Sequence, residues 1–87
     1  MPAWKLKISQ SVLKDLQVLQ KDDRGRAALA ILELAANPQP HGSEKLKSYT
    51  HTYRVRTGDY RIVYEIVGED VTVITVRHRK DVYRDLK

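Results

Sequence analysis

The chain has 87 residues, a formal net charge of +5 at pH 7 and no cysteine. This length suits a single domain, 1–87, with one hydrophobic core, and the absence of cysteine excludes disulfides and thiolate chemistry. With 41% hydrophobic and 31% charged residues, the composition is typical of a globular protein. No segment approaches the ~20 apolar residues that a membrane helix requires, and the start lacks the apolar run of a signal peptide. We therefore expect a soluble cytoplasmic protein.

The first half of the chain predicts one strand followed by two helices. Apolar and basic residues alternate over 4–8, which is the period of a strand, and Ser9 and Ser11 are candidate N-caps of the next helix. Apolar residues then recur with helical spacing at about 10–20 and 24–36, until Asn37-Pro38 ends the second helix. The faces expected to be buried are Val12, Leu13, Leu16 and Leu19 in the first helix, and Ala27, Ala28, Ile31, Leu32 and Ala35 in the second.

The second half predicts a loop and three strands. Residues 37–48 are rich in turn formers, with Leu46 as their apolar anchor. Strands are expected at 52–57, 60–67 and 71–78, joined by tight turns at Gly58 and Gly68 into an antiparallel meander. The order is β-α-α-β-β-β, an α+β fold in which two helices pack on one face of a small, mainly antiparallel sheet. Residues 81–87 add a helical turn or fray.

Alternation within the three strands separates cations from apolar residues. Successive side chains of a strand point to opposite faces, so Arg54 and Arg56 share one face, which Arg61 and Arg77 join from the next two strands. The residues predicted to face the core are Tyr53, Val55, Tyr60, Ile62, Tyr64, Ile66, Ile74, Val76 and His78. The positive excess also lies here, because residues 45–87 hold ten Lys and Arg against six Asp and Glu, whereas 1–44 hold six against five. Four arginines on one sheet face suit a polyanion, and nucleic acid is the obvious candidate.

Several kinds of chemistry are excluded by missing motifs. The histidines lie at 41, 51 and 78 without paired ligand spacing, so we expect no metal site. Neither a phosphate-binding glycine-rich loop nor a nucleophilic Ser or Cys motif is present, so we expect no nucleotide cofactor. RNA, however, carries its own nucleophile, the 2′-hydroxyl, and arginines can stabilise charge on its phosphate. Cleavage of RNA without metal or cofactor therefore fits the residues.

The proton-transfer group has three candidates. His78 has a suitable ordinary pKa of about 6.5, but its parity places it toward the core. Glu65 shares the face of Arg61, where it serves either proton transfer or an ion pair with an arginine. Tyr83 needs neighbouring cations to favour its phenolate. An alternative interpretation remains for the whole face, namely a solvated sheet surface with cross-strand charge pairs.

Three stretches resemble the RelE toxins of prokaryotic toxin–antitoxin systems. They are Tyr53-Arg54-Val55-Arg56, Gly58-Asp59-Tyr60-Arg61-Ile62-Val63-Tyr64-Glu65 and Val76-Arg77-His78-Arg79-Lys80-Asp81-Val82-Tyr83-Arg84. The resemblance spans nearly the whole chain and implies the β-α-α-β-β-β fold expected above. It also implies a toxin that cuts messenger RNA in the ribosomal A site and is silenced by a cognate antitoxin.

The resemblance also assigns roles to individual residues. Arg61 and Arg77 would bind the phosphate and the transition state, and Tyr83 would orient the 2′-hydroxyl or transfer its proton, with His78 in reserve. The best-known members have lysines where this chain has Arg54 and Arg56, and arginine hardly acts as a base. The residues expected to position RNA are Arg54, Arg56, Arg79, Lys45 and Lys47.

Two competing functions stay open within this superfamily. The ParE-like toxins share the fold, lack the nuclease residues and inhibit DNA gyrase by binding it, whereas a degenerate homologue would act mainly through its antitoxin complex. Retention of Arg61, Arg77 and Tyr83 together favours the nuclease. The expected partners are the antitoxin, the ribosome with its mRNA and, through the antitoxin, operator DNA. No membrane partner is expected.

Overall fold

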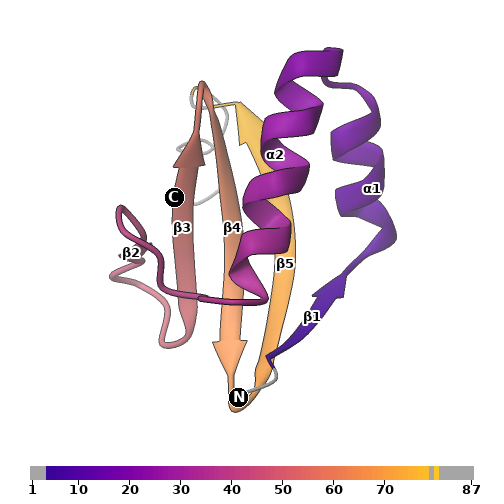
Figure 1. Cartoon of the computed structure of the whole chain (residues 1–87). Helices are drawn as coiled ribbons and strands as arrows, with labels where there is room; N and C mark the ends of the chain where they lie inside the picture. Colours follow the sequence, from indigo (N-terminus) through magenta and orange to yellow (C-terminus); the bar gives the residue numbers. More distant parts are fainter. Residues whose placement is uncertain (1–3, 79, 81–87) are drawn as a thin grey trace.

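The computed structural model describes residues 4–78 and 80, which form a five-stranded sheet with two helices on one face (Figure 1). In chain order the elements are β1 (Lys5–Ile8), α1 (Gln10–Gln17), α2 (Lys21–Leu34), β2 (Glu44–Lys45), β3 (Thr52–Thr57), β4 (Tyr60–Val67) and β5 (Asp70–His78). The predicted fold of two helices on a mainly antiparallel sheet is confirmed. The difference is β2, a two-residue strand within the segment expected to be a loop. Neither described helix is long and apolar enough to cross a membrane.

The strands lie in the order β1-β5-β4-β3-β2, with β1 parallel to β5 and the remaining neighbours antiparallel. The observed bounds of β3 and β4 are those predicted from the alternation. Gly58 and Gly68 begin the two hairpin turns with φ of +61° and +60°, a conformation that a side chain disfavours. These glycines fix where each strand ends, and so fix which residues meet across the sheet.

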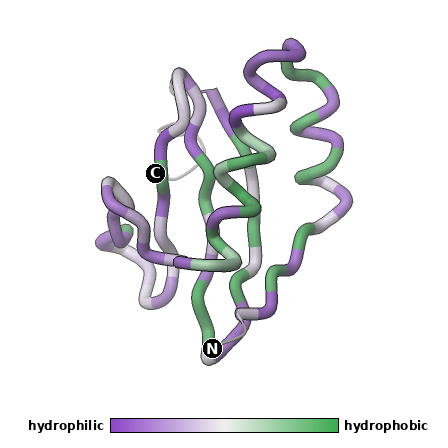
Figure 2. Tube along the Cα trace, viewed as in Figure 1, coloured by the Kyte–Doolittle hydropathy of each residue, from purple (hydrophilic) through white to green (hydrophobic). Residues whose placement is uncertain are grey.

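The core lies between the helices and the sheet, where hydrophobic segments of β4, β5 and both helices face one another (Figure 2). Tyr64 belongs to it, and Tyr53 and Tyr60 pack against it, as predicted. Tyr64 is fully buried, its ring stacks on that of Tyr53 with centroids 5.9 Å apart, and its hydroxyl donates to the carbonyl oxygen of Pro38 at 2.6 Å. This hydrogen bond fastens the segment after α2 to the middle of the sheet.

The predicted helix faces were partly wrong. In α2 the buried residues are Ala27, Ile31 and Leu34, whereas Leu32 is 61% exposed. The helix begins at Lys21, whereas the sequence predicted Arg24. Residues 27, 31 and 34 have helical spacing and form one narrow buried stripe on the helix surface. In α1, which ends at Gln17, Val12 is buried but Leu13 is 50% exposed. Both helices thus carry a leucine that is exposed, and packing against the sheet decides which apolar side chains are buried.

A β-bulge in β5 also overturned one core prediction. Val63 of β4 pairs with Thr75 and the next residue, Tyr64, pairs with Val73, so Ile74 has no partner on β4. The extra residue shifts the alternation by one position. Val71, Val73 and Val76 are therefore buried, while Ile74 is 39% exposed instead of joining the core. Because of the same shift, Thr75 and Arg77 lie on the face away from the helices.

Candidate functional site

Three arginines lie side by side on the sheet face that the helices leave uncovered. Arg56 of β3 pairs with Arg61 of β4, and Arg61 pairs with Arg77 of β5. Residues directly opposite each other on antiparallel strands have Cβ atoms about 4.5–5.5 Å apart, and like charges in such pairs are destabilising. Stability alone therefore does not favour this arrangement. We call Arg56, Arg61 and Arg77 the arginine row.

The members of the arginine row differ in exposure. Arg61, in the middle, is only 5% exposed, whereas Arg56 and Arg77 on either side are exposed. Charge interactions are stronger where water is excluded. The row thus combines two cations that solvent reaches with a central one in a drier environment, an arrangement suited to stabilising negative charge on a bound anion.

Arg54 lies on the same face, two residues before Arg56 on β3, and forms an ion pair with Glu44. Its Nε and Nη2 donate to Oε1 of Glu44 at 3.3 and 3.2 Å, and the two residues are opposite each other in the pairing of β2 with β3. Glu44 was not singled out in the sequence, because β2 was not expected. At this position the face behaves as the charge-pair interpretation predicts.

Arg77 is linked to α1 through a threonine. Its Nε donates to Thr75 Oγ1 at 2.9 Å, and that hydroxyl donates to Asp15 Oδ2 at 3.2 Å. The same carboxylate oxygen accepts the backbone N–H of Val76 at 3.2 Å. Neither Asp15 nor Thr75 was predicted from the sequence. No sequence signal marks them, because their contacts depend on the bulge.

The remaining candidates within the described residues do not gather at the arginine row. His78 lies opposite Tyr60 on the helix side, with the two rings edge-on and their centroids 5.4 Å apart, as its parity predicted. Its Nδ1 accepts the backbone N–H of Lys80 at 3.3 Å. Glu65 is on the arginine face, but four residues along β4 from Arg61, which is roughly 13 Å.

The two lysine candidates are also remote from the row. Lys45 pairs with Tyr53 and so points to the helix side, and Lys47 lies beyond it in the loop to β3. Their contact with RNA stays a prediction. Arg79 and Tyr83 lie outside the described residues.

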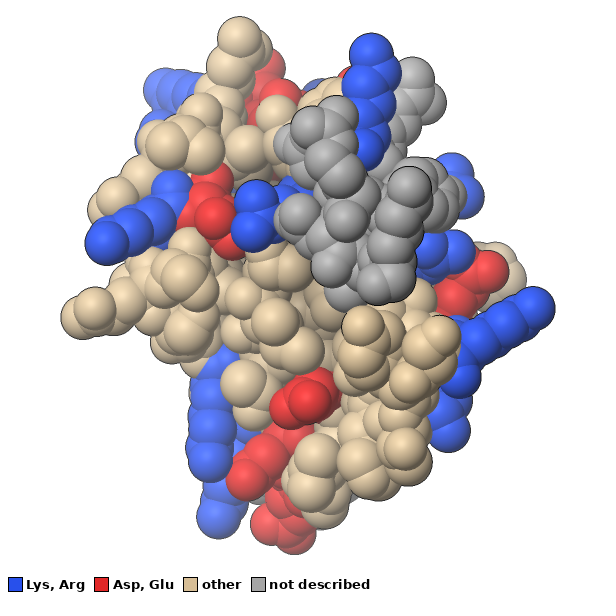
Figure 3. Space-filling view, turned by 180° about the vertical axis from the view of Figure 1, so that it is seen from behind, with Lys and Arg blue, Asp and Glu red and all other residues tan. Residues whose placement is uncertain are grey.

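Charge is unevenly distributed over the face of the sheet opposite α1 and α2. Figure 3 shows Lys and Arg side chains along both flanks and a group of acidic side chains at the lower end, away from the β3–β4 turn. Near that end, Lys7 Nζ and Asp70 Oδ2 form an ion pair at 3.2 Å. Within 4–78 and 80, no group of three His, Cys, Asp or Glu residues could hold a metal ion.

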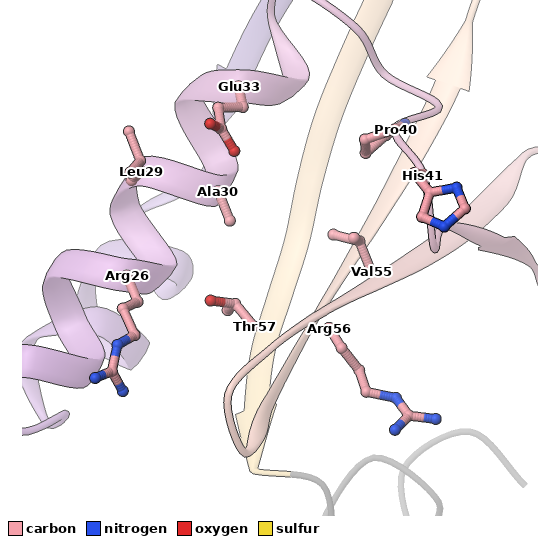
Figure 4. A pocket seen from close by; sticks show the side chains of 9 residues that line it. All are labelled: Arg26, Leu29, Ala30, Glu33, Pro40, His41, Val55, Arg56 and Thr57. Carbon is pink, nitrogen blue, oxygen red and sulfur yellow. The ribbon is translucent and has the colours of Figure 1, made fainter.

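A groove opens beside the arginine row, between α2 and β3 (Figure 4). It measures about 290 Å³ and is lined by Arg26, Leu29, Ala30, Glu33, Pro40, His41, Val55, Arg56 and Thr57. Ala30, Pro40 and Val55 give it an apolar floor, and Arg26 and Arg56 lie at one end. Arg56 therefore belongs to both the groove and the row.

Comparisons with known proteins agree on one group of relatives. A family model described as "ParE toxin of type II toxin-antitoxin system, parDE" matches residues 6–83. Toxin RelE3 of Methanocaldococcus jannaschii is 32% identical over 83 residues, covering 91% of this chain and 94% of that protein.

Solved structures give the same result. The RelB-RelE antitoxin-toxin complex from Methanococcus jannaschii is 29% identical with a TM-score of 0.75, over 93% of this chain and 99% of that one. The archaeal RelE-RelB complex from Pyrococcus horikoshii is 27% identical with a TM-score of 0.77, over 88% and 96%.

Proposed function

Since the chain belongs to the RelE/ParE family of type II toxin–antitoxin toxins, we propose that it is a ribosome-dependent endoribonuclease that cleaves messenger RNA in the ribosomal A site. The arginine row is the observation that carries this proposal. Three guanidinium groups on adjacent strands match the extended negative charge of an RNA backbone. None of the three belongs to the hydrophobic core cluster of the described residues.

In the proposed reaction, the 2′-oxygen attacks the adjacent phosphorus and the bond from phosphorus to the 5′-oxygen breaks. The products are a 2′,3′-cyclic phosphate and a 5′-hydroxyl. The reaction consumes no water and requires no metal ion. Negative charge rises on the phosphoryl oxygens in the transition state, which is where fixed arginine donors lower the barrier. We assign this role to Arg61 and Arg77, and the positioning of RNA to Arg54 and Arg56.

The two proton transfers need groups other than the arginine row, since arginine stays protonated. One group must take the proton of the 2′-hydroxyl and another must supply a proton to the leaving 5′-oxygen. We assign orientation or deprotonation of the 2′-hydroxyl to Tyr83, as the family resemblance implies. The contact of His78 with Tyr60 on the helix side makes that histidine the weaker candidate.

The ribosome has a definite part in this proposal. Among the described residues the row can stabilise charge, but the pockets found there are open ones that include only Arg56 of the row, so they would not bend RNA into line for attack. Alignment of the 2′-oxygen with the leaving group accounts for a large part of the barrier in such reactions. We therefore expect the A site to supply that alignment in the cytoplasm, and free RNA to be a poor substrate.

An antitoxin is the proposed second partner. The two archaeal complexes named above each pair RelE with RelB. For this chain we expect an extended antitoxin segment that wraps the helices, inserts an apolar side chain into the α2–β3 groove and sets acidic residues against Arg26 and Arg56. The complex would contact operator DNA through the antitoxin.

Inhibition of DNA gyrase is the second candidate function, because the matching family model is described by the name ParE. A gyrase inhibitor acts by binding a protein and needs no aligned arginines at a transition state. The arginine row therefore favours the nuclease. A degenerate homologue would retain antitoxin binding but arrest neither translation nor supercoiling.

Primer extension on a message translated in a purified bacterial system tests the proposal. The wild type, Arg61→Ala and Arg77→Ala are compared at equal folded concentration, with Arg24→Ala as a control that removes an exposed arginine of α2. We expect A-site cuts with the wild type and Arg24→Ala, and a loss of at least about 100-fold in rate with each row variant. An intact message together with inhibited gyrase supercoiling would refute the nuclease and establish the alternative.

A further inference from the structure

The edge of β5 is covered by different elements along its length. β1 pairs with β5 from Asp70 to Val73 and then ends at Ile8, where the chain turns into α1 (Figure 1). Within the described residues, 75–78 of β5 have strand pairing to β4 alone, and Ile74 pairs with neither neighbour. Backbone N–H groups on that open edge need another acceptor, since an unmade hydrogen bond is costly.

Asp15 of α1 supplies that acceptor. Its Oδ2 lies 3.2 Å from the backbone nitrogen of Val76 and 3.2 Å from Thr75 Oγ1. Both contacts fall directly after the bulged residue Ile74, where the pairing with β4 shifts. One carboxylate thus takes the place of a strand neighbour and holds α1 against the irregular part of β5.

The hydroxyl of Thr75 connects this carboxylate to the arginine row. A hydroxyl has a single proton to donate, and Thr75 donates it to Oδ2 of Asp15. The lone pairs of Thr75 Oγ1 are therefore directed toward Arg77, whose Nε–H they accept at 2.9 Å. The direction of both hydrogen bonds is fixed, from Arg77 to Thr75 to Asp15, and both include a charged group, which strengthens them.

We propose that Asp15 and Thr75 are positioning residues that fix the Arg77 guanidinium for phosphate binding in the arginine row. With Nε directed at Thr75, the edge formed by Nη1 and Nη2 is the one that meets a phosphate in a bidentate contact. The inference rests on the proposed nuclease function, to which it adds two residues that touch neither RNA nor the reacting atoms.

A purely structural role would explain only half of these contacts. Capping of the β5 edge accounts for the bond from Val76 to Asp15, but it requires neither a hydroxyl at position 75 nor a bond from it to Arg77. Valine has almost the shape of threonine and an equal preference for strands. Thr75→Val therefore removes the connection to Arg77 while it keeps the strand.

Ribosome-dependent cleavage under single-turnover conditions measures the effect of that connection. We expect Thr75→Val to lower the maximal rate about tenfold, the effect of one net hydrogen bond, without weakening ribosome binding. Thr75→Ser, which keeps the hydroxyl, should recover most of that loss. The matched control is Thr72→Val, on the same face of β5 but opposite Glu65, which should change the rate less than about twofold. A Thr75→Val rate equal to that of the wild type would overturn the inference.

A second readout does not depend on the nuclease. The Nε–H resonance of Arg77, assigned by its loss in Arg77→Lys, reports its hydrogen bond through the rate of proton exchange with water. We expect this exchange to be several times faster in Thr75→Val and Asp15→Ala than in the wild type, and unchanged in Thr75→Ser. Unchanged exchange in Thr75→Val would refute the positioning role. If the wild type cuts no message but exchange is still faster in Thr75→Val than in the wild type, the positioning contact exists and the failure lies in the proposed function.

Discussion

The two faces of the β3–β4–β5 meander are built from neighbouring residues of the same strands, yet they behave differently. On the helix side, Ile62, Tyr64 and Val76 are at most 4% exposed and form the centre of the core. On the other side, Arg56 and Arg77 are exposed on either side of the buried Arg61. Strand alternation thus separates the residues that hold the fold from those that can meet an anion. Substitutions on one face should change stability, and substitutions on the other should change activity.

The largest expected effect is on the helix side, in α2. Leu34→Ala should lower the free energy of unfolding by about 3 kcal/mol, because it removes a fully buried side chain and leaves a cavity. Leu32→Ala is the matched control, with a side chain 61% exposed, and should cost less than about 0.5 kcal/mol. Urea unfolding followed by circular dichroism measures both. Equal losses in the two variants would mean that α2 presents a different face to the sheet.

An intermediate effect is expected from the tyrosine at the centre of the core. Tyr64→Phe removes the hydrogen bond to Pro38 and leaves its carbonyl oxygen without that donor, so the loss should be about 1–2 kcal/mol. Thermal unfolding measures it, with Tyr49→Phe as the control, since Tyr49 is exposed. A Tyr64→Phe protein as stable as the wild type would show that this bond does not fasten the segment after α2.

The same tyrosine predicts a dependence on alkaline pH. Burial raises the pKa of the Tyr64 hydroxyl above its ordinary value of 10.0, so the unfolded chain loses this proton at a lower pH than the folded one. The contribution of Tyr64 to stability is therefore complete below pH 10 and is lost as pH rises from there through the folded-state pKa. Between pH 9 and about 11, the wild type should lose more stability than Tyr64→Phe. Parallel loss in the two proteins would contradict the assignment.

The smallest effect is expected at the edge of the arginine face. Glu44→Gln removes the ion pair with Arg54, and because Glu44 is 62% exposed in its side chain, the loss should stay below about 1 kcal/mol. Measurement at low and high salt should show the difference between variant and wild type shrinking as salt screens the pair. A loss above 2 kcal/mol would indicate that β2 is essential to the sheet.

The sequence predicted the meander well because its signals are local. Strict alternation and the glycines at 58 and 68 set both strand bounds and faces, so the positions of Arg54, Arg56 and Arg61 on one side followed from parity alone. The sequence could not show the bulge, since 71–76 consist only of valine, isoleucine and threonine. Any of these residues could have been the unpaired one.

The errors in the helices have a related cause. Alanines and leucines occur around the whole of α2, so the sequence does not show which of them face the sheet. Contacts with the sheet decide that α2 begins at Lys21 and not at Arg24, and that Leu34 is buried while Leu32 is exposed. Asp15 and Thr75 depend in turn on the bulge, and no local pattern indicates them. Local periodicity and turn residues thus predicted the helices and strands, whereas tertiary packing determined the contacts of Asp15, Thr75 and Arg77.

A comparison of Val76→Ala with Arg77→Ala tests the separation of the two faces most directly, because these neighbours point to opposite sides of β5. Each variant is measured for urea unfolding and for cleavage of a translated message per folded molecule. We predict that Val76→Ala loses roughly 2 kcal/mol of stability and keeps its cleavage rate, whereas Arg77→Ala keeps its stability and loses cleavage. Arg77→Ala that cleaves like the wild type, or that unfolds as readily as Val76→Ala, would contradict the account.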